Sequence, residues 1–161
     1  MTWVDSYVTN QVVYACMDPL RVPLETRELA ERAARFFASE LGIPTPEIRW
    51  FDEASLISHA REALNKASAF YTRGGTVYVR LGRHGDELVS SIAHEIRHAW
   101  QAAQDPLFWN YCAGARALDE YEADARAYAS AAAERFRNDS RAKAHAWAYT
   151  VKCMAGGGVR W

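Results

Sequence analysis

Five consecutive residues near the middle of the chain combine side chains that bind metal ions with one that can move a proton. The segment from His94 to His98 has the sequence H-E-I-R-H, an H-E-x-x-H pattern. On a helix, positions 94 and 98 lie about 40° apart around the axis and one turn apart along it, so both imidazoles can face one ion. Glu95 is rotated by about 100° from His94, which keeps its carboxylate off the ion but within reach of a bound water. The pattern predicts a zinc site with Glu95 as catalytic base.

A catalytic zinc ion usually has three protein ligands and one open position, so a third ligand must come from elsewhere in the chain. A stretch of carboxylates follows near residue 120. Glu120 and Asp124 share a helix face, so Glu120 can bind the metal while Asp124 accepts a ring N–H of a liganding histidine. Glu122 lies about 200° from Glu120 and is the alternative third ligand. We expect one Zn²⁺ per chain, bound by His94, His98 and Glu120.

Two predicted helices must carry these groups. Apolar residues recur at helical spacing between Leu88 and Ala103, which predicts a helix over residues 86–103 with the histidines inside it. Ten alanines between Ala113 and Ala133 make the carboxylate segment a strong helix former. A further helix is expected over residues 141–154. The C-terminal half is therefore predicted to be mostly helical.

The preceding part of the chain predicts a mixture of helix and strand. A helix is expected from the N-cap Thr26 to residue 41, where Gly42 ends it. Residues 47–51 alternate like a short strand, residues 54–67 form a weaker helical pattern, and residues 69–72 and 76–81 flank a glycine turn typical of a hairpin. We expect a single α+β domain over residues 1–161, with a small twisted sheet packed on the metal-bearing helix.

The two motifs together resemble those of gluzincin metallopeptidases, in which H-E-x-x-H is followed by E-x-x-x-D. The stretch E-Y-E-A-D from Glu120 to Asp124 is especially similar to the CAAX-prenyl-protease type and to the soluble minigluzincins. The resemblance covers residues 76–129. It implies a zincin-like fold, with Glu120 as a zinc ligand and Asp124 supporting a histidine.

The resemblance also implies how a substrate binds. In gluzincins the strand before the active-site helix edges the cleft, so Val77, Tyr78 and Val79 are expected to pair with an extended peptide through main-chain hydrogen bonds. The implied activity is that of a zinc metalloendopeptidase. Three residues of the helical half are candidates for stabilising the oxyanion, and the sequence does not choose among them: Tyr128, His145 and Tyr149.

The alternative is a catalytically silent or regulatory zinc-binding module, of the kind found in phage or stress systems, that acts on one protein partner. Glu95 argues against a silent module, because a structural zinc site needs no base and is usually closed by a fourth protein ligand.

Composition limits the partners that we expect. The formal net charge of -1 provides no long-range field toward nucleic acid or an anionic membrane, so a peptide or protein is the expected substrate. The odd number of cysteines, three, fits a reduced compartment. The sequence shows no secretory signal pattern and no apolar run long enough to span a membrane, so we expect a cytoplasmic protein. Oligomeric state stays open.

Overall fold

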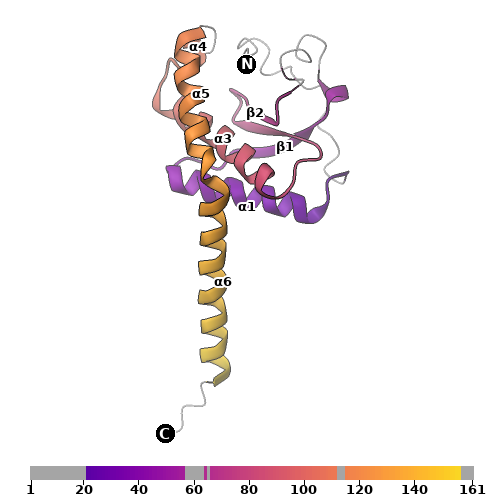
Figure 1. Cartoon of the computed structure of the whole chain (residues 1–161), viewed down its shortest axis with the longest axis vertical. Helices are drawn as coiled ribbons and strands as arrows, with labels where there is room; N and C mark the ends of the chain where they lie inside the picture. Colours follow the sequence, from indigo (N-terminus) through magenta and orange to yellow (C-terminus); the bar gives the residue numbers. More distant parts are fainter. Residues whose placement is uncertain (1–20, 57–63, 65, 112–114, 157–161) are drawn as a thin grey trace.

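The computed structural model describes residues 21–56, 64, 66–111 and 115–156, and it has the expected α+β architecture (Figure 1). A small sheet and helix α1 occupy the first part of the chain, and helices make up the rest. The elements in chain order are α1 (Leu24–Leu41), β1 (Glu47–Phe51), the 3₁₀ helix η2 (Glu53–Ser55), β2 (Ala69–Tyr71), β3 (Thr76–Arg80), α3 (Gly85–Gln104), α4 (Phe108–Tyr111), α5 (Ala115–Ser130) and α6 (Ala132–Gly156). Most of the helix expected over residues 54–67 lies outside the described residues.

The sheet has three strands in the order β1-β3-β2. Strand β1 is parallel to β3, with Trp50 opposite Val79, and β2 is antiparallel to β3, with Ala69 opposite the same Val79. The expected hairpin is confirmed: Thr72 donates a backbone hydrogen bond of 3.0 Å to Thr76, and Gly75 adopts a φ of 82° in the turn. Alternation along β3 buries Val77 and Val79 on the face that carries the core.

The central strand β3 is paired along both of its sides. The register places Val77, Tyr78 and Val79 opposite partners in β1 and also in β2. Main-chain groups used in two ladders cannot receive a third strand. The structure therefore corrects the expectation that these three residues bind a peptide substrate.

Helix α3 is the central element of the fold, and it begins and ends within one residue of the predicted span. It contacts α1, α5, α6, β2 and β3. Its predicted apolar stripe is confirmed as far as Ala99, with Leu88, Ile92 and Ile96 fully buried, whereas Ala103 at its end is exposed. Helix α1 packs on it through small side chains and one aromatic ring: Ala30, Ala33, Ala34 and Phe37.

The N-cap of α1 is Pro23, three residues before the expected N-cap Thr26, and the helix begins at Leu24. The carbonyl of Pro23 accepts hydrogen bonds from the amides of Thr26 and Arg27, so the first turn forms without a side-chain cap. The expected end is confirmed at Gly42, whose φ of 67° lies in the left-handed region that favours glycine.

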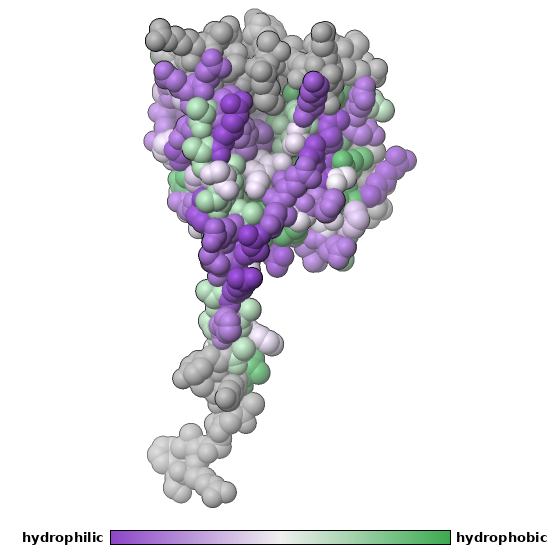
Figure 2. All heavy atoms as spheres, viewed as in Figure 1, coloured by the Kyte–Doolittle hydropathy of each residue, from purple (hydrophilic) through white to green (hydrophobic). Residues whose placement is uncertain are grey.

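The expected mostly helical C-terminal half is confirmed, and its two long helices are α5, in the alanine-rich segment, and α6. Helix α5 ends at Ser130, and α6 then runs for 25 residues, so the helix expected over residues 141–154 is the outer part of α6. This outer part projects from the body of the molecule (Figures 1 and 2). Its Trp147 side chain is 71% exposed. Within the described part of the chain, no helix has the length and apolar character needed to cross a membrane.

Candidate metal centre

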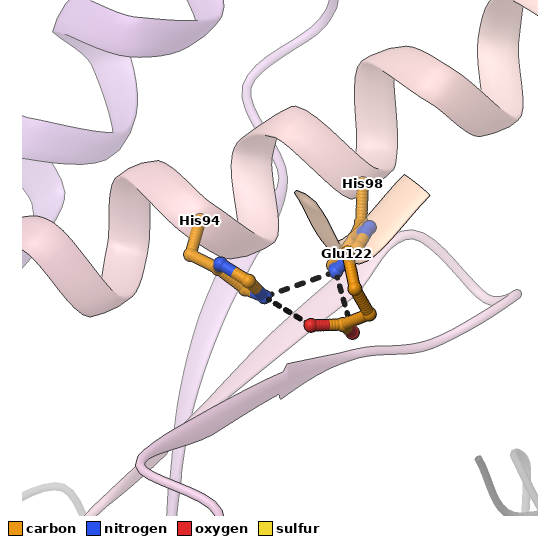
Figure 3. A group of neighbouring side chains, drawn as sticks. All are labelled: His94, His98 and Glu122. Atoms are coloured by element: carbon orange, nitrogen blue, oxygen red, sulfur yellow. Dashed lines mark hydrogen bonds and ion pairs between the residues drawn. The ribbon is translucent and has the colours of Figure 1, made fainter. Parts of the chain in front are cut away.

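Two histidines of α3 and one glutamate of α5 converge at a single point (Figure 3). The Nε2 atoms of His94 and His98 are 3.1 Å apart. Glu122 approaches both rings, with Oε2 at 3.4 Å from His94 Nε2 and Oε1 at 3.3 Å from His98 Nε2. Two imidazole nitrogens and two carboxylate oxygens therefore gather around one small volume, where they could hold a shared ion.

The spacing of these atoms fits a metal ion. Zinc bonds to imidazole nitrogen and carboxylate oxygen are about 2.0–2.2 Å long, and tetrahedral geometry then separates two ligand atoms by roughly 3.3–3.6 Å. The carboxylate of Glu122 lies 3.4 Å from His94 Nε2 through Oε2 and 3.3 Å from His98 Nε2 through Oε1, and the two imidazole nitrogens are 3.1 Å apart. Two imidazoles and one carboxylate can hold a metal ion here, and they leave a coordination position open.

Helix α5 presents Glu122 to the histidines, not Glu120. Glu122 is only 3% exposed, whereas Glu120 lies on the exposed side of the helix. The buried stripe of α5 consists of Glu122, Ala125 and Ala129, which are three and seven residues apart and so share one face. The structure corrects the expectation that Glu120 lies beside the histidines: the alternative Glu122 lies there instead and could serve as the third ligand. The gluzincin motif would have assigned this role to the first glutamate.

A glutamine on α3 positions His98, and sequence reasoning missed it. The Nδ1 atom of His98 is 2.7 Å from Gln101 Oε1. The amide of Gln101 donates through Nε2 to Asp124 Oδ2 at 2.7 Å and to the carbonyl of Tyr121 at 3.0 Å. Two acceptors on the nitrogen side orient this amide, so its oxygen must accept the proton of His98 Nδ1. Nε2 of His98 then carries the lone pair that faces the cluster.

Asp124 supports the site through Gln101, and not through the direct hydrogen bond to a histidine that was expected. It does not contact a histidine directly but accepts a hydrogen bond from Gln101, which holds His98. Arg97 donates two hydrogen bonds, of 2.7 and 3.0 Å, to the same carboxylate. The Arg97 guanidinium holds the pKa of Asp124 below its usual range despite partial burial. The Gln101 bridge is what allows Glu122 and Asp124 to serve the same site. The one sequence signal for Gln101 is that it follows His98 by three residues.

Glu95 is buried beside the cluster, where the motif requires a base. It is 4% exposed, and its Oε2 atom has no hydrogen-bond partner among the described residues. Burial raises the pKa of Glu95, although the neighbouring His98 and His94 oppose this effect. The backbone of Tyr71 in β2 hydrogen-bonds to the carboxylate. A buried carboxylate with a raised pKa and an unused oxygen is suited to accept and return a proton.

The charges of the cluster also suit a metal ion. Burial by itself would raise the pKa of Glu122, but hydrogen bonds and charge interactions with His94 and His98 outweigh it and hold this pKa well below the usual range. Burial acts in the opposite direction on His94 and would lower its pKa. The carboxylates of Glu122 and Glu95 more than reverse this effect, so the pKa of His94 is raised. Glu122 is therefore ionised at neutral pH, as a ligand must be.

A cavity of about 440 Å³ opens directly onto the cluster. It is bounded by His94 and Glu95 of α3, by Arg126 of α5, and by the segment from Lys66 to Ala69 that leads into β2. A larger cavity of about 670 Å³ lies between α1 and α6, and none of its described lining residues belongs to the cluster. Among the described residues, the smaller cavity therefore gives a substrate access to the site.

Tyr128 and His145, two of the three expected oxyanion-stabilising residues, are not among the described residues that line this cavity. The hydroxyl of Tyr128 donates to Glu40 at 2.7 Å, and burial together with that carboxylate raises the pKa of Tyr128. His145 is exposed on the outer part of α6, and the side chain of Tyr149 lies outside the described residues. Arg126 does line the cavity, at 3.3 Å from Glu122 Oε2. Its sequence signal is the four-residue spacing from Glu122.

Comparisons with family models, with curated proteins and with solved structures found no match to this chain. The resemblance of its two motifs to gluzincins stays a prediction. The arrangement of His94, Glu95, His98 and Glu122 is therefore the main indication of function in this chain.

Proposed function

We propose that this protein is a zinc-dependent metallopeptidase that hydrolyses peptide bonds with a water activated by Glu95. One observation carries the proposal: the buried carboxylate of Glu95 has an unused oxygen beside a three-residue metal cluster that opens onto a cavity. A metal site that only stabilised the fold would need neither a base nor an access path.

The protein's own groups divide the chemistry among them. A zinc ion held by His94, His98 and Glu122 would polarise the substrate carbonyl and acidify a bound water. Glu95 accepts the proton of the attacking water and delivers it to the departing amine. Its raised pKa favours holding the proton between these two transfers. Gln101 keeps the His98 ring in one tautomer and one orientation.

Strand β2, rather than β3, is the strand suited to a peptide substrate. It lies at an edge of the sheet, and Ala69 at its start also lines the cavity. The carbonyl of Ser68 and the amide of Thr72 are hydrogen-bonded to β3. Because antiparallel ladders alternate, the backbone groups of Ala69 and Tyr71 point away from β3, and Tyr71 indeed bonds Glu95. An extended peptide pairing with this side of β2 would pass beside the base.

The proposal is tested by separating metal binding from hydrolysis. The zinc-loaded chain and its Glu95→Gln variant are incubated with a degenerate peptide library, and cleavage is followed by mass spectrometry. Glu95→Gln should retain zinc and lose hydrolysis, because an amide keeps the shape but cannot accept the proton. Glu120→Gln makes the same chemical change at an exposed carboxylate and should cleave like wild type. Zinc-loaded wild type that cleaves no peptide, or a Glu95→Gln variant with normal turnover, would refute the proposal.

A further inference from the structure

The walls of the cavity beyond the cluster are made of small, hydroxyl-bearing and cationic side chains. The described residues that line it outside the cluster and Glu95 are Lys66, Ala67, Ser68, Ala69, Ser90, Ser91, Arg126, Ala129 and Ser130. None of these is a large apolar or aromatic residue. The described wall therefore offers charged and hydroxyl hydrogen-bond donors, and it has no large apolar side chain on which a bulky apolar group could pack.

Two cations give this cavity its charge. Arg126 is 65% exposed at the side chain and uses one guanidinium nitrogen to contact Glu122, which leaves other N–H donors of its fork for a ligand. Lys66 is exposed in the turn before β2 and forms no ion pair among the described residues. The two carboxylates of the lining, Glu95 and Glu122, belong to the base and the metal cluster. The remaining wall is therefore cationic.

The serines of α3 add neutral donors to the same wall. Ser90 and Ser91 are half-buried and lie one turn before His94. The hydroxyl of Ser130, by contrast, already donates to the carbonyl of Ala127 at 2.7 Å. Guanidinium, ammonium and hydroxyl donors around one cavity are the groups that recognise a carboxylate.

We propose that this cavity recognises a carboxylate of the substrate, positioned by Arg126 and Lys66 next to the peptide bond that is cut. The proposal rests on the proposed peptidase function and names its substrate class. The carboxylate has two sources with the same chemistry: the side chain of an aspartate or glutamate, or the C-terminus of a short peptide. Arg126 and Lys66 are specificity-determining residues in either case.

The test measures binding, so that it does not depend on turnover. The full-length Glu95→Gln chain is titrated, in the presence of zinc, with four peptides of otherwise identical sequence: internal Glu with an amidated end, internal Gln with a free C-terminus, internal Gln with an amidated end, and internal Leu with an amidated end. We expect one carboxylate peptide to bind at least about 10-fold more tightly than the Gln amide. Whether the internal Glu or the free C-terminus gains the advantage identifies the source.

Charge-removing variants locate the recognition. Lys66→Gln does not touch a metal ligand, so a loss of the carboxylate advantage in this variant cannot come from a damaged cluster. Arg126→Gln, with its zinc content measured in parallel, should reduce the advantage further. Arg141→Gln removes a positive charge from an exposed position on the outer part of α6 and serves as the matched control.

Two results overturn the proposal. The first is that the Gln amide or the Leu amide binds as tightly as both carboxylate peptides, and this includes the case in which no peptide binds measurably. The second is that the tighter binding of a carboxylate peptide survives in the Lys66→Gln, Arg126→Gln double variant. Either result leaves hydrolysis by the wild-type chain intact. Conversely, a carboxylate preference that depends on these cations, in a protein that cleaves no peptide, refutes the proposed function and retains the binding site.

Discussion

Replacing Glu122 by glutamine should remove one ligand of the proposed metal centre without creating a cavity. Glu122 is buried between His94 and His98, and glutamine has nearly the same shape. Glu120→Gln is the matched control, because it makes the same change two residues away on the exposed side of the same helix. The pair therefore separates the role of the ligand from any general effect of charge on α5.

The size of the effect follows from the number of ligands. Structural zinc sites bind with roughly 10–16 kcal/mol across four ligands, so one ligand contributes on the order of 2.5–4 kcal/mol. This corresponds to roughly a 10²- to 10³-fold weaker Kd for Glu122→Gln. Glu120→Gln should change Kd by less than about 2-fold, because an exposed carboxylate outside the cluster makes little contribution through solvent.

Competition with a chromogenic zinc chelator measures both dissociation constants. Circular dichroism of the same samples checks that α5 stays folded. If Glu120→Gln weakened zinc binding as much as Glu122→Gln, or more, then the orientation of α5 on α3 described above would be wrong. The gluzincin assignment of the first glutamate would then be right.

Three further predictions concern the surroundings of the cluster. Gln101→Leu breaks the bridge from His98 to Asp124 and should weaken zinc affinity or activity by about 10- to 100-fold; an unchanged zinc Kd would contradict the bridging role. The pKa of His94 is raised, and zinc binds only the neutral imidazole, so protons compete with zinc for this residue. Zinc affinity should therefore fall as the pH drops through that pKa, by up to about 10-fold per pH unit. Isothermal titrations at several pH values that showed no trend would exclude this competition. Phe108 is fully buried against the His98 ring, so Phe108→Ala should lower the free energy of unfolding by about 3–5 kcal/mol. Trp147→Ala should cost less than about 0.5 kcal/mol, since Trp147 is 71% exposed, and denaturant titrations that gave equal losses would refute the packing described for α6.

The amino-acid sequence by itself determined the parts of the site that depend on a single helix. The apolar stripe from Leu88 to Ile96 predicts α3, and the spacing of His94, Glu95 and His98 places two imidazoles on one face. The hairpin of β2 and β3 was predictable in the same way, because glycine at the turn and alternation along the strand are local signals. These features require no knowledge of what packs against them.

Only the tertiary structure decided which carboxylate reaches the histidines. Alanines occupy alternate positions from Ala123 to Ala129, and at 100° per residue this spacing places small apolar side chains on two opposite sides of α5. No single face is marked for burial, so the rotation of α5 about its own axis is set by its packing on α3. That packing buries Ala125 and Ala129, and Glu122 with them. The same contact brings Gln101 to Asp124. The strand order also depends on pairing between residues far apart in the sequence, and it places β2 rather than β3 at the cavity.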